Sequence, residues 1–192
     1  MLSLGLLGAA PAPGESCARP EADCFVLTSL TIDAPLGRFW KGLRAKFNGQ
    51  LQRTRVEDPI NHEMRNFSDY FPDWEWGLDL RRDSGRWSYG IAVSDRDRFT
   101  FFRTDEFDTN SNGGPYGTAF VEYRPDARTA ITIDVDNAFD TDARRNRLLF
   151  FPNRAAPDDI INEFRERNRH VNFGITLKRS FGGGAAVASP SQ

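Results

Sequence analysis

Apolar and polar residues alternate along most of this 192-residue chain. In the stretch "HVNFGITLKRSF", residues 170–181, every large apolar residue falls on the same parity. Successive side chains of an extended strand point to opposite faces of a sheet, so this pattern places the apolar side chains together on one face. The alternation therefore predicts an all-β protein whose strands have one apolar and one polar face.

Turn-forming residues divide the alternating stretches into strands. Residues 74–80 and 87–93 flank the turn Asp83-Ser84-Gly85 and are predicted to form a hairpin. Residues 119–123 and 131–135 flank a second predicted turn at 124–127. With residues 25–37 and 42–56, the pattern predicts an antiparallel up-and-down meander of about seven long strands. One short helix is expected within "PDDIINEFRERN", where Ile160, Ile161 and Phe164 have helical spacing.

Short turns alternate with long polar segments along the chain. The long segments are residues 57–73, 104–114 and 140–169. Transmembrane β-barrels have the same asymmetry, with short turns on one side of the membrane and long loops on the other. Aromatic residues gather near the predicted tight turns, as in the aromatic girdle of such barrels; they are Phe39, Trp40, Trp87, Tyr89 and Tyr123.

The overall composition does not decide between a soluble and a membrane protein. The chain is 39% hydrophobic and 27% charged, which is ordinary for a soluble domain. Transmembrane barrels also average to a mild hydropathy because they alternate. No uninterrupted apolar run approaches the roughly 18 residues of a spanning helix. The net charge of −2 argues against nucleic acid as a partner.

The two parities predict two surfaces. The residues predicted to face lipid are Trp74, Trp76, Leu78, Leu80, Trp87, Tyr89, Ile91, Val93, Val121, Tyr123, Ile131, Ile133, Val135, Val171, Phe173, Ile175, Leu177 and Phe181. The residues predicted to face a water-filled lumen are Arg44, Lys46, Asp79, Glu122, Asp134, Asp136 and Lys178.

In residues 25–182 the order of motifs resembles the C-terminal barrel strands of TonB-dependent outer-membrane receptors. The motifs are "NFSDYFPDWEWGLDLRRD", "GRWSYGIAVS", "FFRTDEF", "AFVEYRPDARTAITIDVDNAFD" and the closing "VNFGITLKRSF". The chain departs from the family pattern in two respects: Arg179 stands where the terminal strand usually carries an apolar or aromatic residue, and a tail follows Phe181.

The resemblance implies a partial transmembrane β-barrel in the outer membrane of a Gram-negative bacterium. It implies outer-membrane lipid, lipopolysaccharide and the barrel-assembly machinery as partners, with TonB and a small nutrient ligand only in a full-length receptor. The family's plug domain and TonB-contacting box are not recognisable in this sequence, and about seven strands cannot enclose a 22-stranded lumen. We therefore expect a receptor fragment that does not transport by itself.

Three regions are expected along the chain: an N-terminal extension at 1–24, the partial barrel at 25–182, and a disordered tail at 183–192. The extension reads either as a poor signal peptide or as sequence upstream of a mistaken start. Cys17 and Cys24 are either a small disulfide loop or two unpaired thiols.

No catalytic or cofactor-binding constellation is found in the sequence, so we expect neither an enzyme nor a cofactor. His62 and His170 lack partners at zinc-ligand spacing and read as solvated residues. "DTNSNG" matches the opening of a calcium loop, but Ala119 replaces the closing glutamate, so no metal site is expected. The arginines at 144–147 and 165–169 lie among acids and read as an ion-pair network on a solvated loop, with an anionic partner such as lipopolysaccharide phosphate as the alternative.

Two other architectures fit the alternation. A soluble or secreted β-barrel or β-sandwich binding module would turn the apolar parity inward, burying Trp74, Trp76, Ile133 and Phe173 against one another. A self-contained eight-stranded membrane barrel would need another strand from residues 1–24, which the prolines and glycine there disfavour.

Overall fold

The computed structural model describes residues 3–5, 23–67 and 72–181, which form thirteen β-strands and no helix. The strands are β1 (Ser3–Gly5), β2 (Cys24–Pro35), β3 (Leu43–Glu57), β4 (Met64–Arg65), β5 (Trp74–Ser84), β6 (Trp87–Arg96), β7 (Phe99–Phe102), β8 (Glu106–Asn112), β9 (Tyr116–Asp126), β10 (Thr129–Asp136), β11 (Ala143–Phe151), β12 (Asp159–Arg167) and β13 (Asn172–Arg179). Within the described residues, no helix could span a membrane.

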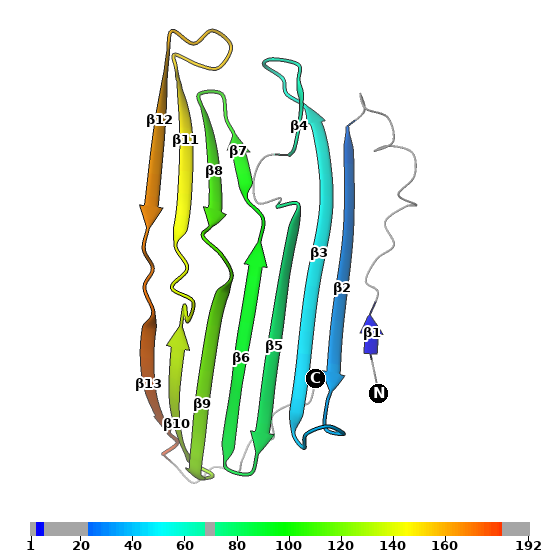
Figure 1. Ribbon diagram of the computed structural model, residues 1–192, viewed down its shortest axis with the longest axis vertical. Coiled ribbons are helices and arrows are strands. Elements are labelled where there is room, and N and C mark those ends of the chain that lie inside the picture. The colour runs from blue at the N-terminus through cyan, green and yellow to red at the C-terminus, as the bar shows by residue number, and fades with distance from the viewer. Residues whose placement is uncertain (1–2, 6–22, 68–71, 182–192) are drawn as a thin grey trace.

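The strands form two antiparallel sheets. The larger sheet has the order β1-β2-β3-β5-β6-β9-β10-β13, with β4 paired to β3 at one end. The smaller sheet has the order β12-β11-β8-β7. Figure 1 shows the smaller sheet continuing the left part of the larger one upwards, so that both share one strand direction. The all-β antiparallel fold predicted from the alternation is confirmed.

The expected number of about seven strands is wrong. Four long chain segments pass through both sheets and are interrupted between them, giving the pairs β6/β7, β8/β9, β10/β11 and β12/β13 (Figure 1). Asn137 fixes one of these interruptions: it is 1% exposed and has a positive φ of 54°. Its side chain accepts a hydrogen bond from the Thr141 amide and donates to the His170 carbonyl, linking two interruptions.

The helix expected within residues 157–168 is also absent. Residues 159–167 form β12, which pairs with β11 from Phe151↔Asp159 to Ala143↔Arg167. Two of the three polar segments expected to be long loops, 104–114 and 140–169, consist mostly of strand, because they contain β8, β11 and β12. In the third, 57–73, the described strand residues are only the end of β3 and β4. The sheet therefore extends well beyond its apolar portion.

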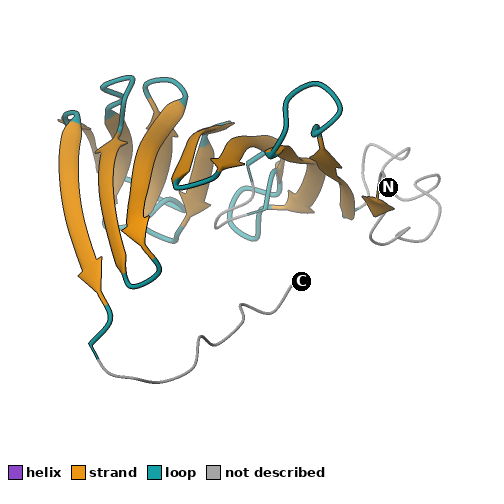
Figure 2. Cartoon of the chain, turned by 90° about the horizontal axis from the view of Figure 1, so that it is seen from below, coloured by secondary structure: helices purple, strands orange, loops and turns teal. Residues whose placement is uncertain are grey.

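The two sheets are one layer deep. Among the described strands, contacts run between neighbours within a sheet, with one small additional contact between β6 and β8 where the two sheets meet, and no second layer packs on either face. Viewed from the end with the tight turns, the layer curves from the N-terminal strands towards β13 (Figure 2). The hydrogen-bonded path of the described strands begins at β1 and ends at β13, so it forms no closed barrel.

The expected region boundaries fall partly outside the described residues. β2 begins at Cys24, one residue before the predicted start of the barrel region at residue 25, and Ser3–Gly5 pairs with β2. Most of the predicted extension and the whole predicted tail, residues 183–192, lie outside the described residues. Cys24 is disulfide-bonded, which excludes an unpaired thiol there, whereas Cys17 lies outside the described part.

The turn between β2 and β3 depends on one glycine. Gly42 has φ +80°, a region that L-residues with a Cβ rarely adopt. Its carbonyl accepts a hydrogen bond from the Asp83 amide at 3.0 Å, so the backbones of this turn and of β5 are in direct contact. A Cβ at Gly42 would lie 1.9 Å from the Asp83 carbonyl oxygen.

We expect Gly42→Ala to lower the free energy of unfolding by about 2 kcal/mol or more, since it combines a left-handed backbone with a steric clash. Gly37→Ala in the same turn is the matched control, because a Cβ there meets no atom within 4 Å. Denaturant titration followed by tryptophan fluorescence measures both. Equal stabilities for the two variants would contradict the geometry of this turn.

Candidate functional site

The register of the larger sheet brings the predicted lipid-facing residues together on one face. Directly paired residues point to the same side. Trp74 pairs with Leu51, Leu78 with both Phe47 and Val93, and Leu80 with Ile91. The rows continue across β6, β9, β10 and β13 through Tyr89↔Val121, Val121↔Ile133 and Ile133↔Ile175. We call this surface the apolar face.

Sixteen of the eighteen residues predicted to face lipid lie in these rows. They are Trp74, Trp76, Leu78, Leu80, Trp87, Tyr89, Ile91, Val93, Val121, Tyr123, Ile131, Ile133, Val135, Phe173, Ile175 and Leu177. The other two, Val171 and Phe181, flank β13 outside its ends. Whether the apolar face contacts lipid remains a prediction.

The apolar face is not covered by other protein atoms of the described chain. Ile133 is 55% exposed, Ile175 78% and Phe173 81%. Only two hydrophobic side chains of the described residues, Cys24 and Phe99, are fully buried. A soluble sandwich would bury Ile133 and Phe173 in a common core, and the described residues contain no such core.

The opposite face carries the residues predicted to line a lumen. Arg44 pairs with Arg81, Lys46 with Asp79, Thr132 with Glu122, and Ala130 with Lys178. Asp134 and Asp136 share this parity on β10. Side chains on this face pack closely against neighbouring strands in places. The Asp134 carboxylate lies over Gly174, and a Cβ atom placed on Gly174 would be 2.5 Å from Asp134 Oδ2. The predicted polar set therefore shares one surface, which we call the polar face.

Aromatic and cationic side chains cluster where the apolar face meets the tight turns. The rings of Trp87 and Tyr123 have centroids 4.5 Å apart. The Arg82 guanidinium carbon lies 4.1 Å from the centroid of the Trp40 ring, and this side chain also donates a hydrogen bond to the Tyr89 hydroxyl. Four of the five residues predicted to form an aromatic girdle thus form two contacts between hairpins, Trp87 with Tyr123 and Trp40 with Tyr89 through Arg82. The fifth, Phe39, is 84% exposed in the first turn.

A hollow of about 630 Å³ opens on the apolar face over Gly49. Its walls include Leu30, Phe47, Trp74 and Trp76, and its lining is almost wholly carbon. Three polar residues, Thr28, Gln50 and Glu75, also border it. The hollow is therefore a mainly apolar depression of the apolar face.

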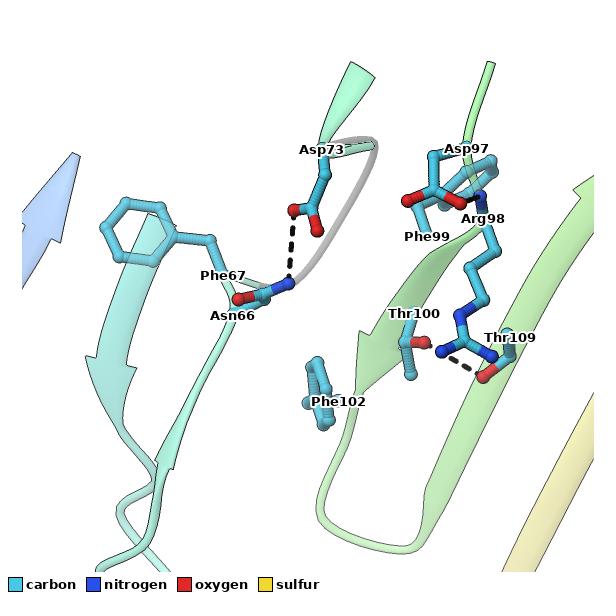
Figure 3. Close-up of a pocket in the computed structure, with 9 residues that line it drawn as sticks. All are labelled: Asn66, Phe67, Asp73, Asp97, Arg98, Phe99, Thr100, Phe102 and Thr109. Atoms are coloured by element: carbon cyan, nitrogen blue, oxygen red, sulfur yellow. Dashed lines mark hydrogen bonds between the residues drawn. The ribbon is translucent and has the colours of Figure 1, made fainter. Parts of the chain in front are cut away.

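A polar pocket separates β7 from the segment around β4 and β5 (Figure 3). It has a volume of about 290 Å³. Its polar groups bond to one another: the Asn66 amide donates to the Asp73 carboxylate at 3.3 Å, and the Thr100 and Thr109 hydroxyls are 2.9 Å apart. Among the described residues, no three His, Cys, Asp or Glu side chains gather as a metal site.

Ion pairs join the strands of the smaller sheet. Arg145 binds Asp108 through two nitrogens, at 2.8 and 2.6 Å. Arg147 bridges Glu106 on β8 and Glu163 on β12, and Arg144 binds Glu166 at 2.8 Å. The hydrogen bonds from Arg145 hold the pKa of the Asp108 carboxyl below its ordinary value despite burial.

The ion-pair network predicted from the interleaved charges is therefore present, but the prediction that it lies on a loop is wrong. Its residues lie on β8, β11 and β12. The segment that matches the opening of a calcium loop is also strand: Asp108, Asn110 and Asn112 belong to β8, and the Asp108 carboxylate accepts hydrogen bonds from Arg145.

A buried carboxylate connects two distant loops at the far end of the sheet. Asp58 is 2% exposed and follows β3. It accepts hydrogen bonds from Arg65 at 2.6 Å and from Arg154, in the β11–β12 turn, at 3.0 and 3.2 Å. Burial alone raises the pKa of the Asp58 carboxyl, but hydrogen bonds from Arg154, the Ile60 amide and Arg65 outweigh it and hold the pKa far below its ordinary value.

Sequence reasoning missed this site, which we call the Asp58 clamp. Arg154 and Asp58 are separated by 96 positions, and no local pattern relates them. Both arginines of the clamp also pack against aromatic rings. The guanidinium carbon of Arg154 lies 4.6 Å from the centroid of the Phe107 ring, and that of Arg65 lies 4.5 Å from the centroid of the Phe102 ring. The two histidines play no part in it, since the side chains of His62 and His170 are 75% and 73% exposed.

We expect Asp58→Asn to reduce the free energy of unfolding by about 3 kcal/mol, because it leaves buried arginines without their counter-charge. The exposed pair Arg44–Asp33, at 3.9 Å, provides the control: Asp33→Asn should change stability by less than about 0.5 kcal/mol. Urea titration at neutral pH measures both variants. Equal losses would show that the clamp contributes no more than a surface pair.

The lowered pKa of Asp58 also predicts a pH dependence. A carboxyl with a lower pKa in the folded state stabilises the fold fully above its unfolded pKa, and the contribution is lost as pH falls below about 5. Acidification should therefore weaken the wild type more than Asp58→Asn, so that their stabilities converge. Parallel pH profiles would contradict this.

No family model matches this chain, and neither the curated proteins nor the solved structures provide a match.

Proposed function

We propose that this chain forms part of the wall of an outer-membrane β-barrel, as the C-terminal barrel segment of a TonB-dependent nutrient receptor. The observation that carries the proposal is the uncovered apolar face, which continues across β2 to β13 while the reverse side is polar. Lipid on one side and water on the other is the environment that such a sheet requires.

The energetic cost of leaving the apolar face in water supports a membrane location. Ten large hydrophobic side chains of its rows are exposed: Leu30, Leu51, Trp87, Ile91, Val121, Ile131, Ile133, Phe173, Ile175 and Leu177. Covering each is worth about 2 kcal/mol, or on the order of 20 kcal/mol together. A folded domain has a total stability of only about 5–15 kcal/mol. A cover of lipid or protein is therefore needed.

The height of the apolar face fits a bilayer. The rows from Trp74 to Leu80 and from Trp87 to Val93 each extend over about 20 Å at 3.3 Å per residue. The lipid-facing band of outer-membrane barrels is about 25 Å tall. Beyond this band the smaller sheet, joined by ion pairs, belongs in water.

The order of the sequence motifs favours a TonB-dependent receptor over other barrels. The "AFVEYRP" and "VDNAFD" motifs lie on β9 and around the end of β10, and the terminal motif forms β13. We propose a fragment because the hydrogen-bonded path of the described strands is open, and unpaired strand edges are not tolerated in hydrocarbon. Transport would need the remaining strands, a plug, TonB and the nutrient ligand; lipopolysaccharide and the barrel-assembly machinery would be further partners.

A soluble or secreted binding module is the second candidate. It would need a second layer over the apolar face, and the described residues provide none. That cover would have to come from a partner protein or from outside the described residues. The membrane candidate is preferred because lipid itself covers the apolar face, while the two open edges of the sheet would pair with the remaining strands of the barrel.

We expect the full chain, expressed with a secretion signal in a Gram-negative host, to fractionate with the outer membrane. In refolding into lipid vesicles, Ile133→Arg should cost about 2–4 kcal/mol because it places a charge in the lipid-facing band. Thr132→Arg is the matched control: its neighbours in register, Glu122 and Thr176, lie on the polar face, so its cost should be below about 1 kcal/mol. Recovery of the wild type as a folded, detergent-free monomer in solution would overturn the proposal.

A further inference from the structure

The end of the sheet that carries the tight turns is strongly basic. We define the basic rim as residues 36–42, 81–86, 124–128 and 178–181, which lie together at the lower end in Figure 1. Its nine basic residues are Arg38, Lys41, Arg81, Arg82, Arg86, Arg124, Arg128, Lys178 and Arg179, against two acids, Asp83 and Asp126.

The opposite end has the reverse balance. Its turns at residues 58–63, 103–105 and 152–158 carry two basic residues and four acids. The chain as a whole has a net charge of −2, so the rim is a local concentration of positive charge and does not reflect the average composition. Such asymmetry creates an electric field at one edge of the apolar face only.

Carboxylates neutralise only part of the rim. Asp83 pairs with Arg81, and Glu122, just outside the rim, pairs with Arg124 at 2.6 Å. Asp126 accepts a hydrogen bond from the Arg128 amide at 2.8 Å. Among the described residues, no carboxylate lies within 4.0 Å of the side-chain nitrogens of Arg82 or Arg179.

Register places both arginines at the ends of apolar rows. Arg82 pairs with Leu43 and Tyr89, and Arg179 follows Leu177 on the same parity of β13. Aromatic rings accompany both: Trp40 lies under Arg82, and the ring of Phe181, which is 87% exposed, lies 5.6 Å from the Arg179 guanidinium carbon. A ring at the edge of the hydrocarbon with a guanidinium just beyond it is typical of a membrane interface.

We propose that the basic rim binds the phosphate groups of anionic glycerophospholipids, an assignment that rests on the proposed membrane function. The continuity of the rim with the apolar face favours this ligand. A free phosphate would contact only the guanidinium groups. A phospholipid would bring its phosphate to Arg82 or to Arg179 and its acyl chains to the apolar row that ends at that arginine. The rim thereby fixes which end of the sheet meets the anionic leaflet and at what depth.

The test compares binding of the full chain to phosphatidylcholine vesicles and to vesicles that also contain phosphatidylglycerol, by flotation and tryptophan fluorescence. The wild type should bind the anionic vesicles more tightly, and salt should reduce the preference. Removal of each arginine should reduce the affinity for anionic vesicles about fivefold. The double variant Arg82→Gln with Arg179→Gln should therefore bind them roughly 25-fold more weakly than the wild type. Arg82→Lys with Arg179→Lys, which keeps the charge, should retain most of the preference.

The matched control is Arg165→Gln with Arg167→Gln on β12, which removes the same charge far from the rim and should leave the lipid preference unchanged. Equal wild-type affinity for both vesicles would overturn the rim proposal and leave the membrane function standing, whereas binding to neither would overturn both. Saturable binding of inorganic phosphate, or of poly-glutamate, as tight as that of anionic vesicles would also overturn the lipid assignment.

Discussion

A single hydrogen-bonded layer whose side chains alternate in register is the constraint on which this structure depends. Because Leu78 pairs with both Phe47 and Val93, and Val121 with both Tyr89 and Ile133, apolar rows run unbroken across the strands. A shift of one residue in any strand would reverse its two faces and place charge among the rows. The same pairing that satisfies the backbone therefore separates an apolar surface from a polar one.

The sheet is stabilised differently along its length. In the larger sheet, the side chains of the apolar face need an apolar solvent, and we propose that lipid supplies it. In the smaller sheet, Arg145 and Arg147 hold three strands together through Asp108, Glu106 and Glu163, which are suited to water. At its far end, the Asp58 clamp ties the loop after β3 to the β11–β12 turn. The transition between these environments coincides with the interruptions at which Asn137 is buried.

The larger sheet was predictable because its two faces differ strongly in polarity. The alternation correctly paired residues 119–123 with 131–135 and assigned Ile133 and Asp134 to opposite faces. The smaller sheet was not, because its faces are mixed. Ile161 shares a face with Arg165 and Ile160 shares the other with Phe164, so period two is hidden and a helix was expected. Pairs as distant as Asp58 and Arg154 leave no local signal in one sequence.

The most direct test of the two-faced sheet is the environment of successive residues on one strand. Single cysteines at positions 130–135 of β10, in a chain with Cys17 and Cys24 replaced by serine, would carry nitroxide labels in lipid vesicles. We expect labels at 131, 133 and 135 to collide with oxygen dissolved in lipid, and those at 130, 132 and 134 to collide with a water-soluble nickel complex. Protection of 131, 133 and 135 from both reagents would instead indicate a dry protein core and contradict the account.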